Sequence, residues 1–283
     1  MCALFEPHYP KPGRWQQPFA LETMLRIHFM QQWFALSAPA MEEARHDIPL
    51  MRAFAGLDAG NDRMPDETTI LNFRHLLERH QLAPQQLAAV NALLSQQGLL
   101  LRQGTLVDPT LIAAPSSTKN QAGKRDPEMS QTKKGNQWYF GAKAHIGVNM
   151  DSGLIHSVQL TTAKVADIRM TDQLLHGEEQ LVIGDGGYHR KDRTFGHTHE
   201  RQGIRMLTPY KRQAGQGLEA GQRAFNQLLP RLRAKVEHPF RVLKQQFGYA
   251  KVRYRGLIKY RVQVEVLFAL VNLYLARKRL LMG

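Results

Sequence analysis

The sequence predicts an α/β protein in which a mixed five-stranded sheet flanked by helices follows an all-helical N-terminal region. Three observations predict this fold class. Apolar residues recur at helical spacing through the first hundred residues, short apolar runs typical of strands follow between residues 105 and 207, and a helical period returns from Leu228 onward. We therefore expect a helical region over residues 1–102 and a sheet-containing domain over residues 103–283.

Four helices are expected in the N-terminal region. Asp66 stands where a helix cap should be, before apolar residues at steps of three and four, and Gly98 is a typical helix stop. The stretch 56–65, rich in Gly, Asp and Asn, predicts a loop. The expected helices span residues 20–36, 39–54, 66–77 and 84–97.

Five short apolar runs are expected to form the sheet. The link Asn149–Gly153 is a hairpin signal, which indicates that the strands on either side of it are antiparallel neighbours. The polar stretch Lys119–Lys134 carries five Lys or Arg side chains and predicts a loop, and residues 165–175 predict a helix. The expected strands are Thr105–Val107, Trp138–Val148, Leu154–Thr161, Gln180–Gly184 and Ile204–Leu207.

The C-terminal part of the chain predicts two long helices. From Leu228, an apolar stripe and a neighbouring polar stripe run at steps of three and four. Pro239 lies inside this segment, so we expect a kink or a helix restart near His238. The terminal helix is expected over Leu257–Leu280. The apolar stripe consists of Leu229, Leu232, Val236, Phe240, Leu243 and Phe247, and the polar stripe of Arg233, Glu237, Arg241 and Lys244.

Positive charge is concentrated near the C-terminus. The whole sequence carries a formal net charge of +14, but residues 201–283 hold 18 basic and 3 acidic side chains, whereas the first 200 residues are nearly neutral. A local basic surface is the electrostatic mark of a polyanionic partner. Nucleic acid is therefore the expected partner, although ribosomal and membrane-surface proteins share such a skew.

Cysteine content and hydropathy indicate the compartment. The single cysteine, Cys2, excludes disulfides within the chain and zinc clusters built on cysteine, and it suits a reducing cytosol. Residues 1–14 contain three prolines and no apolar run, which is unlike a signal peptide. The most apolar stretch, Val262–Leu275, is interrupted by three polar side chains, which favours a buried helix over a membrane span. We therefore expect a cytoplasmic protein without membrane contact.

Three acidic residues stand where they could hold metal ions. Asp108 and Asp185 each follow a short apolar strand, and Glu237 is the sole acid between Ala220 and Val264. Three carboxylates suit Mg²⁺ or Mn²⁺, and two such ions can stabilise the attacking and leaving oxygens of a phosphoryl displacement. From the pattern alone, each Asp could equally be a turn former or a helix cap, and Glu237 could be half of a surface ion pair.

Seven phrases occur in order along nearly the whole chain. They are Leu21–Arg26, Pro65–Arg74, Gly104–Asp108, Gln131–Trp138, Lys143–Val148, Gly184–Tyr188 and Val236–Arg241. Together they resemble the DDE transposases of bacterial insertion sequences, specifically the insertion-sequence-five group. The resemblance implies a ribonuclease-H-like catalytic core over residues 103–283. It also implies that the N-terminal region 1–102 binds DNA ends, mediates dimerisation, or does both.

The resemblance assigns roles to individual residues. Asp108, Asp185 and Glu237 fall on the family's three metal-binding acids, which implies two Mg²⁺ or Mn²⁺ ions. Arg233 and Lys244 keep the spacing of the family's C-terminal signature around Glu237, but Pro230 stands at its tyrosine position. The implied DNA contacts are Arg233, Lys244, Arg241, Lys133, Lys134 and Trp138. The alternative for these six residues is a solvated helix face and a basic surface loop with one packed aromatic.

The implied reaction is hydrolysis of DNA at the transposon ends, followed by transfer of the freed 3′-OH into target DNA. The expected partners are double-stranded DNA, both terminal repeats and target, and a second copy of the chain in a homodimer. The expected location is the bacterial cytoplasm, in association with the nucleoid. Two alternatives stay open. One is a catalytically decayed copy that only binds DNA, and the other is a ribonuclease-H-like nuclease that only hydrolyses it.

Overall fold

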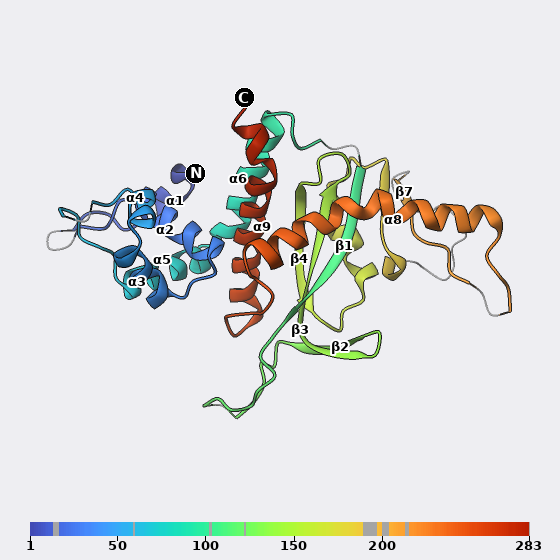
Figure 1. Ribbon diagram of the computed structural model, residues 1–283, viewed down its shortest axis with the longest axis horizontal. Coiled ribbons are helices and arrows are strands. Elements are labelled where there is room, and N and C mark those ends of the chain that lie inside the picture. The colour runs from blue at the N-terminus through green and yellow to red at the C-terminus, as the bar shows by residue number, and fades with distance from the viewer. Residues whose placement is uncertain are drawn as a thin grey trace.

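The computed structural model describes residues 1–13, 17–58, 60–101, 104–121, 123–188, 197–199, 204–212 and 215–282. Figure 1 shows the N-terminal helices on one side, the sheet on the other, and the upright helices α6 (Leu82–Gln96) and α9 (Leu257–Leu280) between them. Because α6 packs against α9, the N-terminal region is joined to the sheet through the last helix of the chain. In the described part of the chain, no helix is long and apolar enough to cross a membrane.

The N-terminal helices enclose a core of their own. Its buried side chains include Phe5, Met24, Ile27, Phe73 and Leu77. The helices are α1 (Cys2–Phe5), the short 3-10 helix η1 (Glu6–His8), α2 (Leu21–Trp33), α3 (Ala38–Asp47), α4 (Pro49–Ala55) and α5 (Glu67–Arg79). The predicted all-helical N-terminal region is therefore present.

Local chemistry explains where these helices begin and end. The Asp66 carboxylate accepts the backbone N–H of Thr69 at 2.7 Å, so the predicted cap opens α5. The segment expected as one helix over residues 39–54 is two helices instead. Ile48 is extended, with φ −111° and ψ 101°, because the proline that follows it disfavours the helical conformation.

The sheet contains seven strands in the described residues, whereas the sequence predicted five. The strands are β1 (Gly104–Ala113), β2 (Ser130–Lys134), β3 (Gln137–Asn149), β4 (Ile155–Thr162), β5 (Leu181–Ile183), β6 (His197–His199) and β7 (Ile204–Leu207). Their order is β2-β3-β1-β5-β7-β6, and β4 pairs with β3. The β3 pairings are antiparallel, whereas β1–β5 and β5–β7 are parallel, so the sheet is mixed as expected.

The two additional strands are β2 and β6, and β2 lies in the stretch that was predicted to be a loop. Its sequence, Ser-Gln-Thr-Lys-Lys, shows no apolar alternation, because all five residues are polar or charged and the strand lies at the edge of the sheet. Pairing of Lys133 with Trp138 and of Lys134 with Gln137 forms a hairpin with β3.

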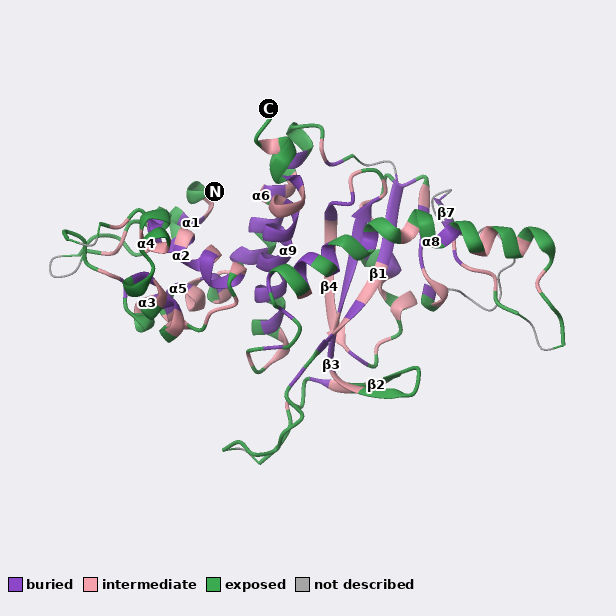
Figure 2. Cartoon of the chain, viewed as in Figure 1, coloured by how far each residue is buried: buried purple, intermediate pink, exposed green. Residues whose placement is uncertain are grey.

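Helices cover both faces of the sheet. One face packs Leu106, Ile146 and Val148 against α6, α8 (Ala220–Arg241) and α9 in the largest core. The other face packs Val107, Val182 and Met206 against the short helices η2 (Asp167–Met170), α7 (Thr171–Leu174) and η3 (Gly186–Tyr188). The middle of α9 carries apolar residues on all sides and is buried in Figure 2, together with the polar Gln263, Glu265 and Asn272.

Helix α8 carries the predicted apolar and polar stripes across the sheet (Figure 1). Leu229, Val236 and Phe240 are buried, but Leu232, at the edge of the stripe, is 41% exposed. The expected restart at His238 is wrong, because α8 continues through Pro230 and Pro239 to Arg241. The hydrogen-bonding pattern changes only afterwards, in the π-helical turn η4 (Val242–Gln246).

Candidate active site

Two of the predicted acids lie at matching positions on neighbouring parallel strands. Leu106 of β1 pairs with Ile183 of β5, Asp108 stands two residues beyond Leu106, and Asp185 stands two residues beyond Ile183. Parallel strands run in the same direction with the same rise per residue, so residues two positions beyond a pair again lie side by side. Both carboxylates therefore lie at the same end of the β1–β5 pair.

The third acid comes from the helix that crosses this pair. Arg233 and Glu237 are four residues apart on α8 and therefore share one of its faces. Arg233 donates from Nη2 to Oδ1 of Asp108 at 2.7 Å, which fixes this face over β1. The side chains of Asp108 and Arg233 are 16% and 19% exposed, so the ion pair is largely shielded from water.

The pKa of Asp108 reflects its burial first and the neighbouring charges second. Burial raises the pKa of Asp108 from its ordinary value of 3.8 to about 7, Arg233 opposes this rise, and the negative charges of Asp185 and Glu237 add to it. Lys134 of β2 also lowers the pKa of Asp108. The structure therefore brings Asp185, Glu237, Arg233 and Lys134 within electrostatic range of Asp108, whose charge Arg233 and Lys134 offset only in part.

This donor set fits a hard divalent cation. Mg²⁺ and Mn²⁺ take carboxylate oxygens as ligands, and a cation beside Asp108 would stabilise its ionised form, which burial and the charges of Asp185 and Glu237 disfavour. Arg233 already occupies Oδ1 of Asp108, so the cation and the guanidinium would share this carboxylate.

Asp185 is held by a tight turn after β5. Its Oδ1 accepts the backbone N–H of Gly187 at 2.8 Å, and its carbonyl accepts that of Tyr188 at 3.1 Å. A Cβ at Gly187 would lie 2.9 Å from both Asp185 Oδ1 and Asp167 Oδ2, so a side chain here would displace these two carboxylates. A Cβ at Gly186 would meet only Lys211 Cε, at 3.6 Å. Glycine at 187 thus lets the Asp185 and Asp167 carboxylates keep their positions.

A second layer of polar residues, which sequence reasoning did not place in the site, backs this turn. Asp167 Oδ1 accepts from Lys143 Nζ at 2.8 Å, and His145 Nδ1 lies 3.9 Å from the same oxygen. Tyr188 is fully buried, and its hydroxyl has no hydrogen-bond partner among the described residues. Its pKa is raised by burial first and then by the charges of Asp167, Asp108 and Asp185.

No local pattern marks Asp167 in the sequence, because its partners lie on β3 and after β5. His145, which was not proposed as a ligand, is fully buried and contacts Thr161 Oγ1 at 2.8 Å. Burial lowers its pKa to about 4, so it is a neutral packed residue of the sheet at physiological pH.

The basic residues expected to contact DNA lie in three places. Lys244 reaches β1, where its Nζ donates to the carbonyl of Leu111 at 3.0 Å, and burial followed by the charge of Lys134 lowers its pKa. Arg241 is exposed and donates to Gln245 Oε1 at 3.3 Å. On the β2–β3 hairpin, Lys133 and Lys134 stand opposite Trp138 and Gln137, and the Trp138 side chain is 65% exposed. Trp138 is therefore not the packed aromatic of the alternative interpretation.

Two family models match the chain. Residues 100–273 match the model described as Transposase DDE domain, and residues 1–76 match the model described as Transposase domain (DUF772). The first match covers more than half of the chain and includes Asp108, Asp185 and Glu237. The chain therefore belongs to the family of transposases with a DDE domain.

Proposed function

We propose that this transposase cleaves DNA at the ends of its element and joins the resulting 3′-OH to target DNA, and that Asp108, Asp185 and Glu237 form its catalytic centre. The observation that carries the proposal is the placement of the acids: Asp108 and Asp185 stand two residues beyond the paired residues Leu106 and Ile183, and Arg233, one helical turn before Glu237, bonds to Asp108 at 2.7 Å. The charges of Asp185 and Glu237 add to the burial that raises the pKa of Asp108, and a bound cation would offset them.

The proposed metal ligands are the carboxylates of these three residues. Bound Mg²⁺ or Mn²⁺, as two ions, would supply electrostatic stabilisation of the attacking and leaving oxygens. Arg233 keeps Asp108 oriented and offsets part of the negative charge. The Gly187 N–H fixes the rotamer of Asp185 through its 2.8 Å hydrogen bond. Glu237 is exposed on α8, and its position lets it meet DNA that approaches from solvent.

Two phosphoryl displacements make up the proposed reaction. In the first, a water oxygen bonds to phosphorus at the element end, the bond from phosphorus to the 3′ oxygen breaks, and a 3′-OH and a 5′-phosphate result. In the second, that 3′ oxygen bonds to a phosphorus of the target, and the target's own 3′ oxygen leaves. The number of phosphodiester bonds is unchanged in the second step, so it needs no external energy source.

The basic residues around the acids would hold the DNA backbone that the carboxylates repel. Lys134 of β2 interacts with Asp108, and Lys244 of η4 reaches Leu111 on the same strand as Asp108. Lys133, Arg233 and Arg241 add further positive charge on β2 and α8. Trp138 offers an exposed aromatic face beside Lys133, which suits stacking on a base of an unpaired end. We assign these six residues to DNA binding.

The remaining parts of the proposal rest on the same family and sheet. We regard β2 and β6, which end the strand order, as additions to the sheet. The five expected strands of a ribonuclease-H-like core are then β1, β3, β4, β5 and β7. The proposal also includes membership of the insertion-sequence-five group and a homodimer that pairs two element ends. It divides the chain into two domains at residue 102 and places the protein at the bacterial nucleoid.

The test is a strand-transfer assay on the native element ends with Mg²⁺, with Mn²⁺ and with chelator. Asp108→Asn, Asp185→Asn and Glu237→Gln should each abolish cleavage and joining while DNA binding persists. Asp151→Asn is the matched control, because Asp151 is exposed in the β3–β4 turn and contributes its backbone groups to hydrogen bonds there. Full activity of any of the three acid variants would refute the catalytic assignment. Cleavage without joining would indicate the nuclease, and binding without cleavage by the wild type would indicate the decayed copy.

A further inference from the structure

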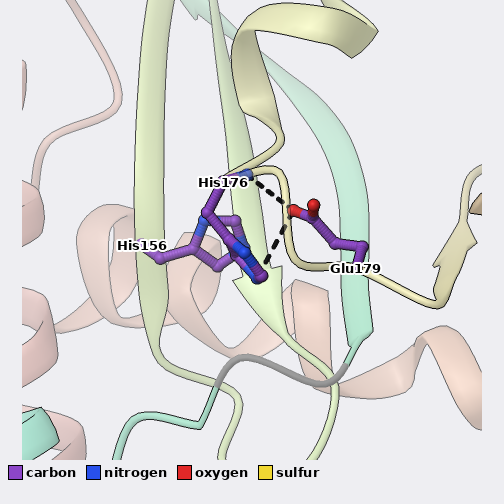
Figure 3. Close-up of side chains that lie close together, drawn as sticks. All are labelled: His156, His176 and Glu179. Carbon is purple, nitrogen blue, oxygen red and sulfur yellow. Dashed lines mark hydrogen bonds and ion pairs between the residues drawn. The ribbon is translucent and has the colours of Figure 1, made fainter. Parts of the chain in front are cut away.

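A second cluster of potential metal ligands lies away from the three acids. It consists of His156 on β4, and His176 and Glu179 on the segment that connects α7 to β5. One nitrogen of each histidine and one oxygen of Glu179 all lie within 4.8 Å of one another. Figure 3 shows the two imidazole rings side by side with the Glu179 carboxylate facing His176.

The cluster is separate from the proposed catalytic centre. Thr105 of β1 contacts it, with Oγ1 at 3.0 Å from His156 Nε2 and 3.1 Å from Glu179 Oε1. Thr105 and Asp108 are three residues apart on one strand, so their side chains point to opposite faces of the sheet. The cluster therefore lies at the start of β1 and β5, whereas Asp108 and Asp185 lie beyond their paired segment.

The sheet is shaped to bring His156 into this position. The pairing of β3 with β4 shifts register between Gly147 and Val148, so that Ser157 and Ile155 have partners on β3 and His156 is the extra residue of a β-bulge. A Cβ at Gly147 would lie 2.7 Å from His156 Cε1 and 2.4 Å from the carbonyl oxygen of Leu174. The bulge turns the imidazole inward, and Gly147 leaves the room that it occupies.

The other two ligands are equally constrained. The Glu179 side chain is fully buried, and it accepts the backbone N–H groups of His176 at 2.7 Å and of Gly177 at 2.8 Å. His176 Nε2 is buried, has no hydrogen-bond partner among the described residues and lies 3.4 Å from Glu179 Oε1. Two ligands of a tetrahedral zinc ion, each bonded at about 2.05 Å, are about 3.3–3.4 Å apart. The observed separation matches this edge.

We propose that His156, His176 and Glu179 bind a Zn²⁺ ion, which joins β4 to the segment that leads into β5. Two imidazole nitrogens and one carboxylate oxygen are a donor set that zinc uses, whereas Mg²⁺ prefers oxygen ligands alone. A water molecule completes the tetrahedron. Thr105 acts as a hydrogen-bonding partner of the ligands, and through it the ion also holds the start of β1 in place.

Direct binding measurements test the site without reference to DNA cleavage. The protein is the tag-free full chain with Cys2→Ser, because Cys2 is an exposed thiol that could bind zinc by itself. Calorimetric titration of chelator-treated protein with ZnCl₂, in excess Mg²⁺, should show saturable binding of one zinc ion per chain. The thermal unfolding midpoint should rise by several degrees at a zinc concentration about 100-fold above Kd. Co²⁺ in place of zinc should give the intense visible absorption of tetrahedral coordination.

Variants locate the ion. Thr105→Val should weaken zinc binding by about 10–100-fold, because Thr105 supports the ligands. The zinc affinity should fall further in each of the ligand variants His156→Gln, His176→Gln and Glu179→Gln. His75→Gln is the matched control, because His75 also precedes a glutamate by three residues but lies on α5, where Glu78 pairs with Arg74. The triple variant of Asp108, Asp185 and Glu237 to their amides should retain zinc binding.

Two results would overturn the proposal. One is the absence of saturable zinc binding by the wild-type chain, and the other is zinc binding that His176→Gln leaves unchanged. If Glu179→Gln fails to fold, His176→Gln and the cobalt spectrum of the wild type decide the question, because His176 is partly exposed at 14% and tolerates substitution better.

Discussion

Replacement of Asp108 by asparagine should stabilise the metal-free protein at neutral and alkaline pH while it abolishes cleavage. The folded state holds the proton of Asp108 more tightly than the unfolded state does, because burial and the neighbouring acids raise its pKa from 3.8 to about 7. Between these two values the folded protein binds more protons than the unfolded chain, so stability falls as the pH rises. Asparagine has no charge to lose and removes this dependence.

The size of the effect follows from the difference between the two pKa values. About three pKa units at about 1.36 kcal/mol each set a ceiling of about 4 kcal/mol at and above pH 7. The carboxylate keeps 16% of its surface in water and retains Arg233 as a partner, so we expect a gain of about 1–3 kcal/mol. The gain should shrink to below about 1 kcal/mol near pH 4, where the wild-type carboxyl is protonated in the folded state.

Urea unfolding followed by circular dichroism, in chelator at several pH values from 4 to 8, measures this difference. Asp151→Asn, which changes an exposed carboxylate and leaves Asp108 in place, is the control: its stability should follow that of the wild type at every pH in this range. Added Mg²⁺ should stabilise the wild type at pH 8 and have less effect on Asp108→Asn. A stability difference between Asp108→Asn and wild type that is the same at pH 4 and pH 8 would refute the electrostatic reasoning.

Three further changes test the turn, the core and the DNA surface. Gly187→Ala should cost about 1–3 kcal/mol and strongly reduce cleavage because its Cβ would crowd Asp185 Oδ1 at 2.9 Å, whereas Gly186→Ala, measured in the same assays, should be tolerated. Asn272→Ala should lower the free energy of unfolding by about 1–3 kcal/mol, because the buried N–H and carbonyl of Ile155 lose their partner; a urea titration measures this, and an unchanged midpoint would contradict it. Trp138→Ala should change stability by less than about 0.5 kcal/mol but weaken binding of single-stranded DNA ends by about 1–3 kcal/mol, as fluorescence anisotropy would show, and equal affinity would remove Trp138 from the DNA surface.

The helices and strands that were predicted correctly are those whose own residues show a regular apolar spacing or a local cap. The terminal helix was predicted over Leu257–Leu280, and α9 has these bounds. The cap at Asp66 was also predicted correctly, because capping depends on residues that are adjacent in sequence. Strand β2 could not be found in this way, since its polar residues are held by pairing with β3 and not by a buried face. Leu232 fitted the apolar stripe of α8, but its exposure depends on what the sheet covers.

The candidate site was predicted in part. Asp108, Asp185 and Glu237 were proposed from their neighbours in sequence and from a family resemblance, and the structure places their charges close enough to alter the pKa of Asp108. Asp167 was missed, since its ion pair with Lys143 spans 24 residues. The two histidines and Glu179 were missed because a bulge and a connecting segment bring them together.

The sequence by itself determined the helical and strand periods, the concentration of positive charge after residue 200 and the identity of the three acids. These properties depend on residue type and on spacing of a few residues, which the linear order contains. Only the tertiary structure decided that Arg233 pairs with Asp108 across 125 residues, and that Glu179 lies near His156 beside Thr105. Such contacts depend on strand order and register, which are set by packing of the whole sheet against its helices.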